Sequence, residues 1–310
     1  ARRIAKKAGM LGALAAEREV ESLRVDIAAQ VRQLFYDALA AQARTKIMED
    51  LCADAESLAR LMRTRFEQGD APEADVMRAE ADHQQYRADL ENARGIRDAL
   101  RAQLAELCGF AAGEMPECAG IIAPGGDALP DIAVLDARIR STPRSAVRML
   151  REEQAETQTK ALRRAAIPEP ALRVGLRRQD ASGTNTLDIG VSVGLPIFDR
   201  NQGAVAASKA YMHRVLAENE AKRRAELRAA LALRNEAAAA IAAAERLRAD
   251  VIPRWEAICE SMQKALDLGG ASLFEVLSAR RDLAQARLEL LKEELAARNF
   301  MIALTALLGE

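Results

Sequence analysis

Aromatic residues are scarce in this 310-residue chain: Phe, Tyr and Trp together account for 3% of its positions. The core of a globular enzyme normally uses these rings as bulky filler, so their scarcity argues against an ordinary enzyme core. Alanine supplies much of the 50% hydrophobic content instead, alongside 29% charged residues. This composition is typical of long helices that pack closely side by side.

An excess of charge and a long apolar run are also missing. The formal net charge is −1, whereas a nucleic-acid-binding domain carries a basic face, so we expect no nucleic-acid partner. No run of about 18 consecutive apolar residues occurs, so the sequence predicts no transmembrane helix. The first residue is Ala rather than Met, and we expect a start that was processed or cut.

Catalytic and metal-binding signatures are absent from the sequence as well. His83 and His213 are the two histidines. They fall in different predicted helices, and we expect His83 to lie on or beside a helix seam. Phosphate-binding glycine loops and the HExxH and GxSxG motifs do not occur. We therefore expect no enzyme activity, no cofactor, no metal site and no catalytic residue.

The four cysteines show no metal-ligand spacing such as CxxC. Cys52 and Cys259 lie within helical patterns, where cysteine usually serves as small buried filler. Cys108 and Cys118 flank a loop that contains Gly and Pro, and they could form a disulfide in an oxidising compartment. The sequence leaves open whether they do.

An internal repeat is the most informative organisational feature. Residues 50–109 match residues 250–309 at a constant offset of 200, and both the turn glycines and the apolar seam coincide. The identical residues of the first copy, each matched 200 positions later, are Asp50, Glu56, Met62, Gly69, Ala71, Val76, Ala79, Asp82, Gln85, Arg87, Leu90, Leu104, Leu107 and Gly109. Both copies are therefore expected to share one fold.

Each copy of the repeat predicts a helical hairpin. In the first copy, apolar residues recur at steps of three and four, which predicts a helix from about residue 3 to residue 66 and a second helix ending near residue 107. The second helix has a heptad-like seam, which indicates coiled-coil packing. The seam of the long helix is expected to consist of Leu51, Ala55, Leu58, Met62 and Phe66.

Turn residues separate the helices of each hairpin. Glycine tolerates the left-handed position after a helix, and proline suits the first turn of the next one. In the second copy, Pro253 lies inside the long helix and is expected to kink it. The turn residues are Gly69, Asp70, Ala71 and Pro72 in the first copy and Gly269, Gly270, Ala271 and Ser272 in the second.

A different pattern lies between the two copies. Residues 110–130 are expected to form a loop and residues 132–166 shorter helices, one of them starting at Ser141-Thr142-Pro143. Residues 172–177 alternate apolar and polar or bare side chains, and residues 187–195 do so strictly, which predicts two strands around a turn at residues 180–186. On the second strand the polar or bare positions are Asp188, Gly190, Ser192 and Gly194.

Two interpretations of the strands remain open. In one, an ordinary hairpin buries its apolar face on a soluble core. In the other, the hairpin spans a membrane with its apolar face toward lipid and its polar face toward a water-filled lumen. Two strands cannot close a barrel, and lipid does not tolerate open sheet edges. The second interpretation therefore requires several chains to contribute strands to one barrel.

These features together resemble the TolC-type outer membrane efflux proteins. The resemblance rests on two helical hairpins related by a repeat and on a β-hairpin that runs into GLPIFDRNQG before a long alanine-rich helix. The LPIFDRNQG corner, residues 195–203, is most similar to the heavy-metal cation efflux branch, the outer membrane components of Czc- and Cus-type pumps. The resemblance covers essentially the whole chain.

The resemblance implies a homotrimer in the outer membrane that extends into the periplasm. Each chain would add strands to a shared transmembrane β-barrel in outer-membrane lipid and helices to a periplasmic α-barrel. The expected partners are a periplasmic adaptor (membrane fusion) protein and an inner-membrane RND-type pump. Family members carry a strand pair ahead of each long helix, whereas here a hairpin precedes only the second. The resemblance therefore leads us to expect an N-terminally truncated chain.

Four segments follow from the repeat and the resemblance together. They are a first helical hairpin (residues 1–109), an equatorial loop with short helices (110–168), a β-barrel hairpin (169–200) and a second helical hairpin (201–310). The residues singled out on the barrel hairpin, Asp188, Gly190, Ser192 and Gly194, are expected to face the lumen.

The resemblance also assigns roles near the hairpin turns. Residues 69–72 and 269–272 would be periplasmic tips that contact the adaptor. Asp75 and Glu275 share one repeat position, and a trimeric ring of such acids at the entrance would favour cations and repel anions. Alternatively, each acid only stabilises the N-terminus of its helix through the dipole.

A third gate position and three arginines complete these expectations. Ser278 stands where the family often has a second acid. Arg63, Arg65 and Arg78 lie near the first tip and could hold a closed state through ion pairs, although single surface pairs are weak.

The leading functional hypothesis is the outer-membrane channel of a tripartite efflux pump, a passive conduit for substrates such as heavy-metal cations. The alternative is a soluble coiled-coil scaffold or a periplasmic adaptor protein. An adaptor would need additional β-rich domains, and the sequence offers candidates for only two strands.

Overall fold

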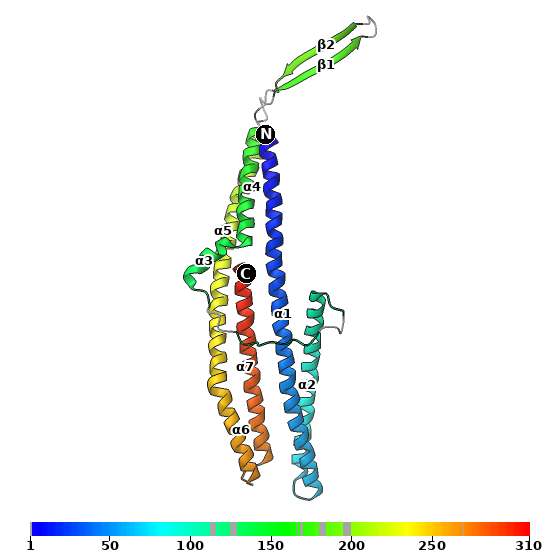
Figure 1. The fold of residues 1–310 in the computed structure, drawn as a ribbon, viewed down its shortest axis with the longest axis vertical. Helices are drawn as coiled ribbons and strands as arrows, with labels where there is room; N and C mark the ends of the chain where they lie inside the picture. The colour runs from blue at the N-terminus through cyan, green and yellow to red at the C-terminus, as the bar shows by residue number, and fades with distance from the viewer. Residues whose placement is uncertain are drawn as a thin grey trace. The chain divides into compact units, whose positions relative to one another are not determined.

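The computed structural model describes residues 2–111, 116–124, 129–165, 167, 170–179, 184–194, 200–268 and 270–310. Long helices make up most of this part of the chain, together with a two-stranded hairpin (Figure 1). The elements are α1 (Arg2–Glu67), α2 (Glu73–Cys108), α3 (Ile132–Ser141), α4 (Pro143–Ala165), β1 (Ala171–Gln179), β2 (Thr184–Ser192), α5 (Gln202–Arg246), the π-helical turn η1 (Leu247–Val251), α6 (Ile252–Asp267) and α7 (Leu273–Leu307). The mainly α class predicted from the sequence, with helical hairpins and one β-hairpin, is confirmed.

The chain divides by its contacts into two compact units. The strand-bearing unit comprises Ala1–Leu23, Asp136–Leu227 and Gly309. The tip unit comprises Arg24–Leu135, Arg228–Leu308 and Glu310. Both α1 and α5 contribute residues to each unit. The four segments expected from the sequence follow the order of elements along the chain, and that division stays a prediction.

The internal repeat has a counterpart in the backbone of the tip unit. In the first hairpin turn, the Asp70 N–H donates to the Arg65 carbonyl oxygen at 2.8 Å. In the second, the Gly270 N–H donates to the Ala265 carbonyl oxygen at the same distance. Both bonds join residues five positions apart, as in the motif that satisfies the last carbonyls of a helix. The two copies therefore end their long helices in the same way.

Alanine residues occupy the closest contacts between α1 and α2. Ala79 is 0% exposed and Ala93 is 2% exposed, and each packs against apolar residues of α1. The Thr45 hydroxyl of α1 lies 3.4 Å from the Ala93 carbonyl oxygen of α2, so a short side chain reaches the neighbouring backbone. The alanine-rich composition is thus explained by close helix packing.

The predicted seam of the long helix is largely confirmed. Leu51, Ala55, Leu58 and Met62 are buried. Phe66 was expected to continue this seam, and that expectation is wrong because its side chain is exposed. The helix α1 ends at Glu67 and α2 begins only at Glu73, so no paired helix lies beside Phe66 to cover it.

The second long helix changes its hydrogen-bond pattern just before Pro253. In η1 the Ile252 N–H donates to the Leu247 carbonyl oxygen, five residues back instead of four. Proline has no N–H and its ring crowds the preceding turn, and a widened π-helical turn relieves that crowding. The sequence predicts a disturbance of the helix at Pro253, and the structure places it in the turn directly before that residue.

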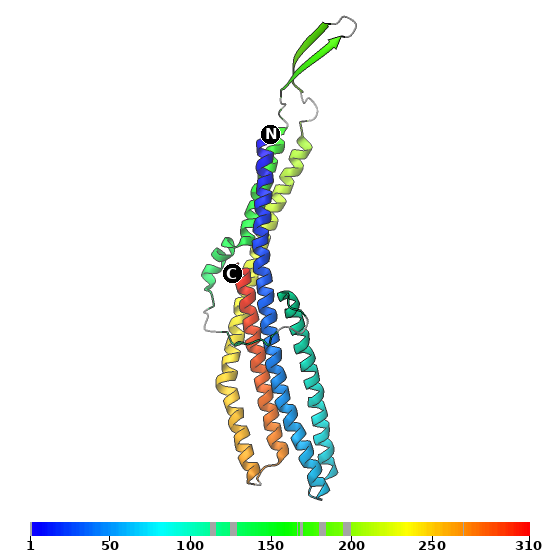
Figure 2. The ribbon, with the colours of Figure 1, turned by 45° about the vertical axis from the view of Figure 1, so that its right-hand side comes forward.

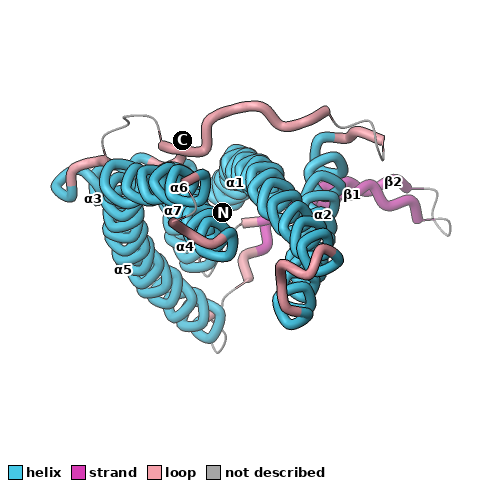
Figure 3. The backbone as a smooth tube through the Cα atoms, turned by 90° about the horizontal axis from the view of Figure 1, so that it is seen from below, coloured by secondary structure: helices cyan, strands magenta, loops and turns pink. Residues whose placement is uncertain are grey.

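Within the tip unit, α6 and α7 lie on one side of α1 and α2 lies on the other (Figures 1 and 3). Contacts along α7 join it to α1: the Asn299 amide donates to the Asp37 carboxylate at 3.0 Å. By contrast, α6 has no buried residue, although its sequence has an apolar seam. Its apolar face is therefore only partly covered by the rest of the chain.

Residues 116–124 form a strap that crosses α1 and α7 in the tip unit (Figure 2). The Gln42 side chain of α1 makes two hydrogen bonds to the Cys118 backbone. Its oxygen accepts from the Cys118 N–H at 3.0 Å, and its amide nitrogen donates to the Cys118 carbonyl oxygen at 3.3 Å. The Arg298 guanidinium of α7 donates to the carbonyl oxygens of Ile122 and Ala123 at 3.2 and 2.6 Å. Arg298 also lies over the Tyr36 ring, 4.8 Å from its centroid. The strap thus connects both repeats.

The strand-bearing unit packs α4 against α5 through polar groups. Arg148 pairs with Glu226 at 2.6 Å, and both side chains are largely buried. The Asn219 amide donates to the Arg148 carbonyl oxygen at 3.3 Å and to the Glu152 carboxylate at 2.9 Å. A helix starts at Ser141-Thr142-Pro143 as the sequence predicts, and Thr142 caps it, since its hydroxyl oxygen accepts the N–H three residues further on at 3.1 Å.

The two strands form an antiparallel hairpin. Its apolar pairs are Leu172 with Val191, Val174 with Ile189, and Leu176 with Leu187. Because side chains alternate between the faces of a strand, these pairs share one face. That face is uncovered: Leu176 is 83% exposed and Val191 is 71% exposed.

The strand boundaries differ from the prediction in two places. The turn expected over residues 180–186 is too long, since β2 already begins at Thr184, paired with Gln179. Ladder hydrogen bonds use the backbone and do not require apolar side chains, so polar residues can extend a strand. At the other end, β2 stops at Ser192, which leaves Gly194 beyond the strand.

We predict that Arg298→Lys loosens the strap. Lysine keeps the charge but loses the planar fork that reaches two carbonyl oxygens and stacks on Tyr36. The lost hydrogen bond and stacking are expected to cost about 1–2 kcal/mol. Hydrogen–deuterium exchange of peptides covering residues 116–124 should accelerate, while Arg254→Lys, at an exposed site on α6, should leave it unchanged. Equal exchange in the two variants would contradict a clamping role for Arg298.

Candidate functional site

The first hairpin turn has an uncapped helix start. Gly69 adopts the left-handed conformation with φ 82°, which glycine allows without a steric penalty. Pro72 precedes α2 in an extended conformation and gives no side-chain cap. Asp75 lies in the first turn of α2, where a carboxylate favours the positive end of the helix dipole. The Asp75 carboxylate thus makes no capping hydrogen bond with Pro72.

The second hairpin turn has a complete capping box. The Ser272 hydroxyl oxygen accepts the Glu275 N–H at 3.3 Å. The Glu275 carboxylate accepts the Ser272 N–H at 2.7 Å and its hydroxyl at 2.9 Å. These bonds favour the charged form, and the backbone bond from Ser272 is the main cause of a lowered Glu275 pKa. Gly269 lies outside the described residues, whereas Gly270 and Ala271 lead directly into this cap.

The two acids at the shared repeat position therefore differ in surroundings. Glu275 is exposed and engaged by its own helix start, and Asp75 is half-buried beside an uncapped start. The expectation that each acid serves its helix N-terminus has direct support at Glu275. The expectation of a carboxylate ring at an entrance concerns several chains and stays a prediction for both.

Apolar packing joins the two hairpins near the tips. Leu58, Met62 and Val76 of the first hairpin form a buried cluster, against which Phe274 and Leu277 of α7 pack. The start of the second hairpin's return helix thus rests on the first hairpin.

Two of the three arginines expected to hold this region make contacts that differ in kind. Arg63 pairs with Glu80 inside the first hairpin. Arg78 lies over the ring of Phe274, 5.0 Å from its centroid, so it contacts the second hairpin through a cation–π interaction. For Arg65, the described residues give no ion pair.

Arg280 was not singled out from the sequence, and it makes the polar link between the hairpins. Its guanidinium donates to the Asp54 carboxylate of α1 at 2.6 Å and to the Gln263 side chain of α6 at 3.2 Å. A signal exists in the repeat: position 80 is Glu in the first copy, and the matching position 280 is Arg. The matched positions have different partners, since Glu80 pairs with Arg63 within the first hairpin and Arg280 reaches Asp54 of α1.

Ser278 lies on a second polar contact beside this link. Its hydroxyl oxygen accepts from the Arg281 guanidinium at 3.3 Å. Arg281, Asp82 and Tyr86 line a small pocket of about 60 Å³ between α2 and α7. Burial raises the pKa of the Tyr86 hydroxyl, and the neighbouring Arg281 opposes that rise. The third predicted gate position, Ser278, thus has a neutral hydroxyl that is bound by Arg281.

Two of the predicted lumen-facing residues, Gly190 and Ser192, share the face of the hairpin opposite the apolar pairs, whereas Gly194 lies beyond β2. Gly190 and Ser192 pair with Arg173 and Ala171 across the ladder. The Asp188 backbone belongs to β2, and its side chain lies outside the described part, as do residues 195–199 of the corner that carries the family resemblance. In the described end of that corner, Asn201 adopts the left-handed region with φ 57° and its amide donates to the Leu162 carbonyl oxygen at 3.1 Å.

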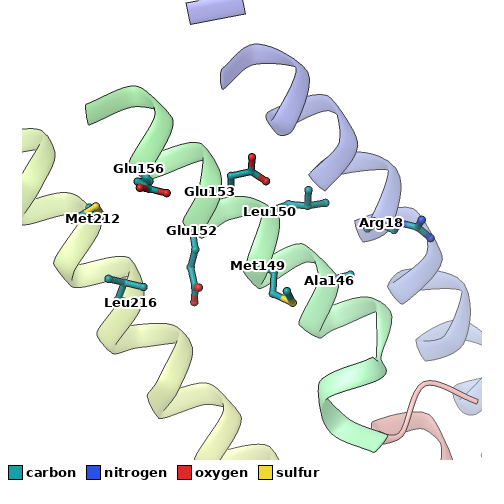
Figure 4. A pocket seen from close by; sticks show the side chains of 9 residues that line it. All are labelled: Arg18, Ala146, Met149, Leu150, Glu152, Glu153, Glu156, Met212 and Leu216. Carbon is teal, nitrogen blue, oxygen red and sulfur yellow. The ribbon is translucent and has the colours of Figure 1, made fainter. Parts of the chain in front are cut away.

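An open pocket of about 770 Å³ lies in the strand-bearing unit, lined by residues of α1, α4 and α5 (Figure 4). Two methionines and three glutamates contribute to its wall. Each glutamate already has a polar partner: Glu152 receives the Asn219 amide, while Glu153 and Glu156 pair with Lys7 and Lys160. The pocket therefore presents no uncompensated carboxylate.

The described residues contain no group of three or more His, Cys, Asp or Glu side chains placed to hold a metal ion. Among the helices of the described ranges, none is apolar enough over a sufficient length to cross a membrane. All four cysteines are free thiols in the structure.

Comparisons with known proteins agree on one family. Residues 5–110 and 144–310 match the family model described as outer membrane efflux protein. The chain is 26% identical over 279 residues to the cobalt-zinc-cadmium resistance protein CzcC of Cupriavidus metallidurans. That alignment covers 89% of this chain and 66% of CzcC, so the chain spans just under two thirds of the length of this curated relative.

Solved structures show the same fold. The Campylobacter jejuni CmeC outer membrane channel superposes with a TM-score of 0.85 and 16% identity, covering 99% of this chain and 67% of that one. The channel protein CusC superposes with a TM-score of 0.81 and 19% identity, covering 99% of this chain and 73% of that one. Members of the outer membrane efflux protein family lie in the outer membrane and extend into the periplasm. Because the family model matches most of this chain, the chain belongs to that family.

Proposed function

We propose that this chain is a subunit of a passive export conduit through the outer membrane and that it catalyses no reaction. The uncovered apolar face of the β-hairpin carries this proposal, since Leu176, Ile189 and Val191 are all strongly exposed. The opposite face has glycine and serine at Gly190 and Ser192. Lipid on one side and water on the other would satisfy both faces.

The conduit is proposed to be a homotrimer. A single hairpin has two unpaired edges, and lipid offers no hydrogen bonds to them. Neighbouring copies can pair those edges, which supports an assembly of several chains. The incompletely covered apolar face of α6 gives further support, because a ring of helices would cover it. The proposed partners are a periplasmic adaptor protein at the tips and an inner-membrane RND-type pump.

Heavy-metal cations are the proposed cargo. The similarity to CzcC supports this, since the name of that protein concerns resistance to cobalt, zinc and cadmium. Acids near both tips, Asp75 and Glu275, are compatible with cation passage. A conduit needs no tight ligand cluster, because an ion that must leave is best held weakly.

Membrane fractionation and planar-bilayer recording test the conduit directly. The full chain should appear in the outer-membrane fraction, run as a detergent-stable trimer and give discrete conductance steps. A monomer found only in soluble fractions would instead support the coiled-coil scaffold or adaptor. Cargo is tested separately: a host that has a Czc-type pump and adaptor but lacks its own channel should regain growth on zinc or cadmium. Conductance without regained growth would reject the cargo and retain the conduit.

The proposed gate predicts that charge, and not only the helix cap, matters at position 275. Glu275→Gln keeps a capping-box partner but removes a charge from each copy, so the cation-to-anion permeability ratio should fall several-fold. Ser272→Ala keeps the charge and removes the cap, at a cost of about 0.5–2 kcal/mol. Reversal potentials in salt gradients provide the measurement. If Ser272→Ala changes selectivity and Glu275→Gln does not, Glu275 serves only its helix.

Asp75→Asn is expected to lower the same permeability ratio with only a small loss of stability. Pro72 provides no side-chain cap, so the substitution breaks no capping bond and removes only a dipole contribution of about 0.3–1 kcal/mol. Asp70→Asn, at the exposed turn, serves as the matched control for a charge outside the proposed ring. Equal effects of the two substitutions on selectivity would remove Asp75 from the gate.

The Arg280–Asp54 pair is expected to hold the second hairpin against the first. Replacing either residue should raise the open probability of the channel, because the polar link between α7 and α1 near the tips is lost and the Asn299–Asp37 hydrogen bond that still joins these helices lies far from the tips. The exchanged pair, Arg280→Asp with Asp54→Arg, should restore the original behaviour in part. The pair is partly exposed, so the coupling energy should be below about 1 kcal/mol. Disrupting the exposed Arg60–Glu56 pair within α1 should have no effect, and a similar effect there would argue against a specific link.

A further inference from the structure

Cys118 anchors the strap at the place where the strap meets the first hairpin. Its side chain is 8% exposed and belongs to a buried cluster with Ala38, Leu39 and Leu104. Its backbone is held from both sides by the Gln42 amide. The position of this thiol is therefore well defined by packing and by hydrogen bonds.

Cys108 is the last residue of α2 and lies next to the same cluster. It follows Leu104 by four positions, and residues four apart share one face of a helix. Leu104 is buried in the cluster that contains Cys118. Gly109 then adopts the left-handed conformation with φ 75°, which ends α2 and turns the chain away from the helix axis. The connection from Cys108 thus leaves α2 and returns to the same core at Cys118.

Cys118 also responds electrostatically to Cys108. Burial is the main reason why the pKa of the Cys118 thiol is raised, and proximity to Cys108 raises it further, while Arg101 acts in the opposite direction. Cys108 is exposed and Cys118 is buried. An accessible thiol, one helical turn beyond Leu104, therefore precedes by ten residues a sheltered thiol in the cluster that contains Leu104.

We propose that Cys108 and Cys118 form an intramolecular disulfide in the exported protein, which fastens the strap to the end of α2. The compartment favours it, because the bacterial periplasm is oxidising. The proposal is independent of the conduit function and depends only on export of the chain.

The reaction balances as thiol–disulfide exchange with an oxidised dithiol oxidoreductase of the periplasm. The accessible Cys108 Sγ, as thiolate, attacks a sulfur of the oxidant and forms a mixed disulfide, which releases one oxidant thiolate. The Cys118 Sγ then attacks Cys108 Sγ and displaces the second oxidant thiolate. The two cysteines lose two protons and two electrons, and the oxidant's disulfide is reduced to two thiols.

The bond would add a third fastening to the strap. Gln42 holds it to α1 and Arg298 holds it to α7, and the disulfide would hold it to α2. A covalent link that closes a short loop stabilises chiefly by limiting the unfolded chain. The strap would then connect three helices of the tip unit through contacts that do not depend on one another.

Thiol trapping followed by peptide mass spectrometry tests the proposal on the full chain. Cells that export the protein are treated with N-ethylmaleimide before lysis, and the outer-membrane protein is digested without reductant. We expect a linked peptide pair containing Cys108 and Cys118, lighter by about 2 Da than the two free peptides. Cys52→Ser and Cys259→Ser are the matched controls and should leave the linked pair unchanged. In a host without the periplasmic dithiol oxidase, the linked pair should be lost.

Three outcomes would overturn the proposal. The first is Cys108 carrying N-ethylmaleimide in wild-type protein recovered from the outer membrane. The second is a linked pair that joins Cys108 of two copies, seen as a dimer band on a non-reducing gel. The third is a linked pair that contains Cys52 or Cys259. All three are read from the wild-type protein, so the test does not depend on whether Cys108→Ser or Cys118→Ser folds.

Discussion

The short distance between α1 and its neighbouring helices is the constraint on which the tip unit depends. Ala79 and Ala93 are fully or almost fully buried where α2 meets α1, and the Thr45 hydroxyl reaches the backbone of α2 there. Larger residues at these positions would push the helices apart, because packed interiors have little spare volume. The contacts between the hairpins require this close spacing. Among them is the packing of Phe274 of the second hairpin against the first hairpin. The low aromatic content follows from the same constraint.

The two hairpins of the repeat share a backbone architecture but differ in the chemistry of their side chains. Their turns share the same five-residue backbone bond, yet only the second helix start has a capping box. Charge is reversed between Glu80 and Arg280, and Arg280 reaches across to Asp54. The two matched positions therefore serve different contacts, one within the first hairpin and one between the hairpins.

The β-hairpin exposes its apolar residues, whereas the strap buries some of its own. The apolar pairs of β1 and β2 are uncovered within this chain, which is costly in water and favourable in lipid. The strap, although it has no regular secondary structure, buries Cys118 and Ile122 and gives its carbonyl oxygens to Gln42 and Arg298. A loop that crosses helices in this way needs such partners, because buried backbone groups are rarely left unpaired.

Periodicity and turn chemistry in the sequence were enough to determine the helices, the hairpin turns, the helix start at Ser141-Thr142-Pro143 and the alternation of the strands. These features depend on near neighbours in the sequence or on a single residue type. The repeat also indicated the shared position of Asp75 and Glu275. The strand ends, the exposed Phe66, the capping box that engages Glu275 and the contacts of Arg78, Arg280 and Arg298 were decided by the tertiary structure. A long arginine side chain can reach several partners from one position, and only the packing of the helices selects among them.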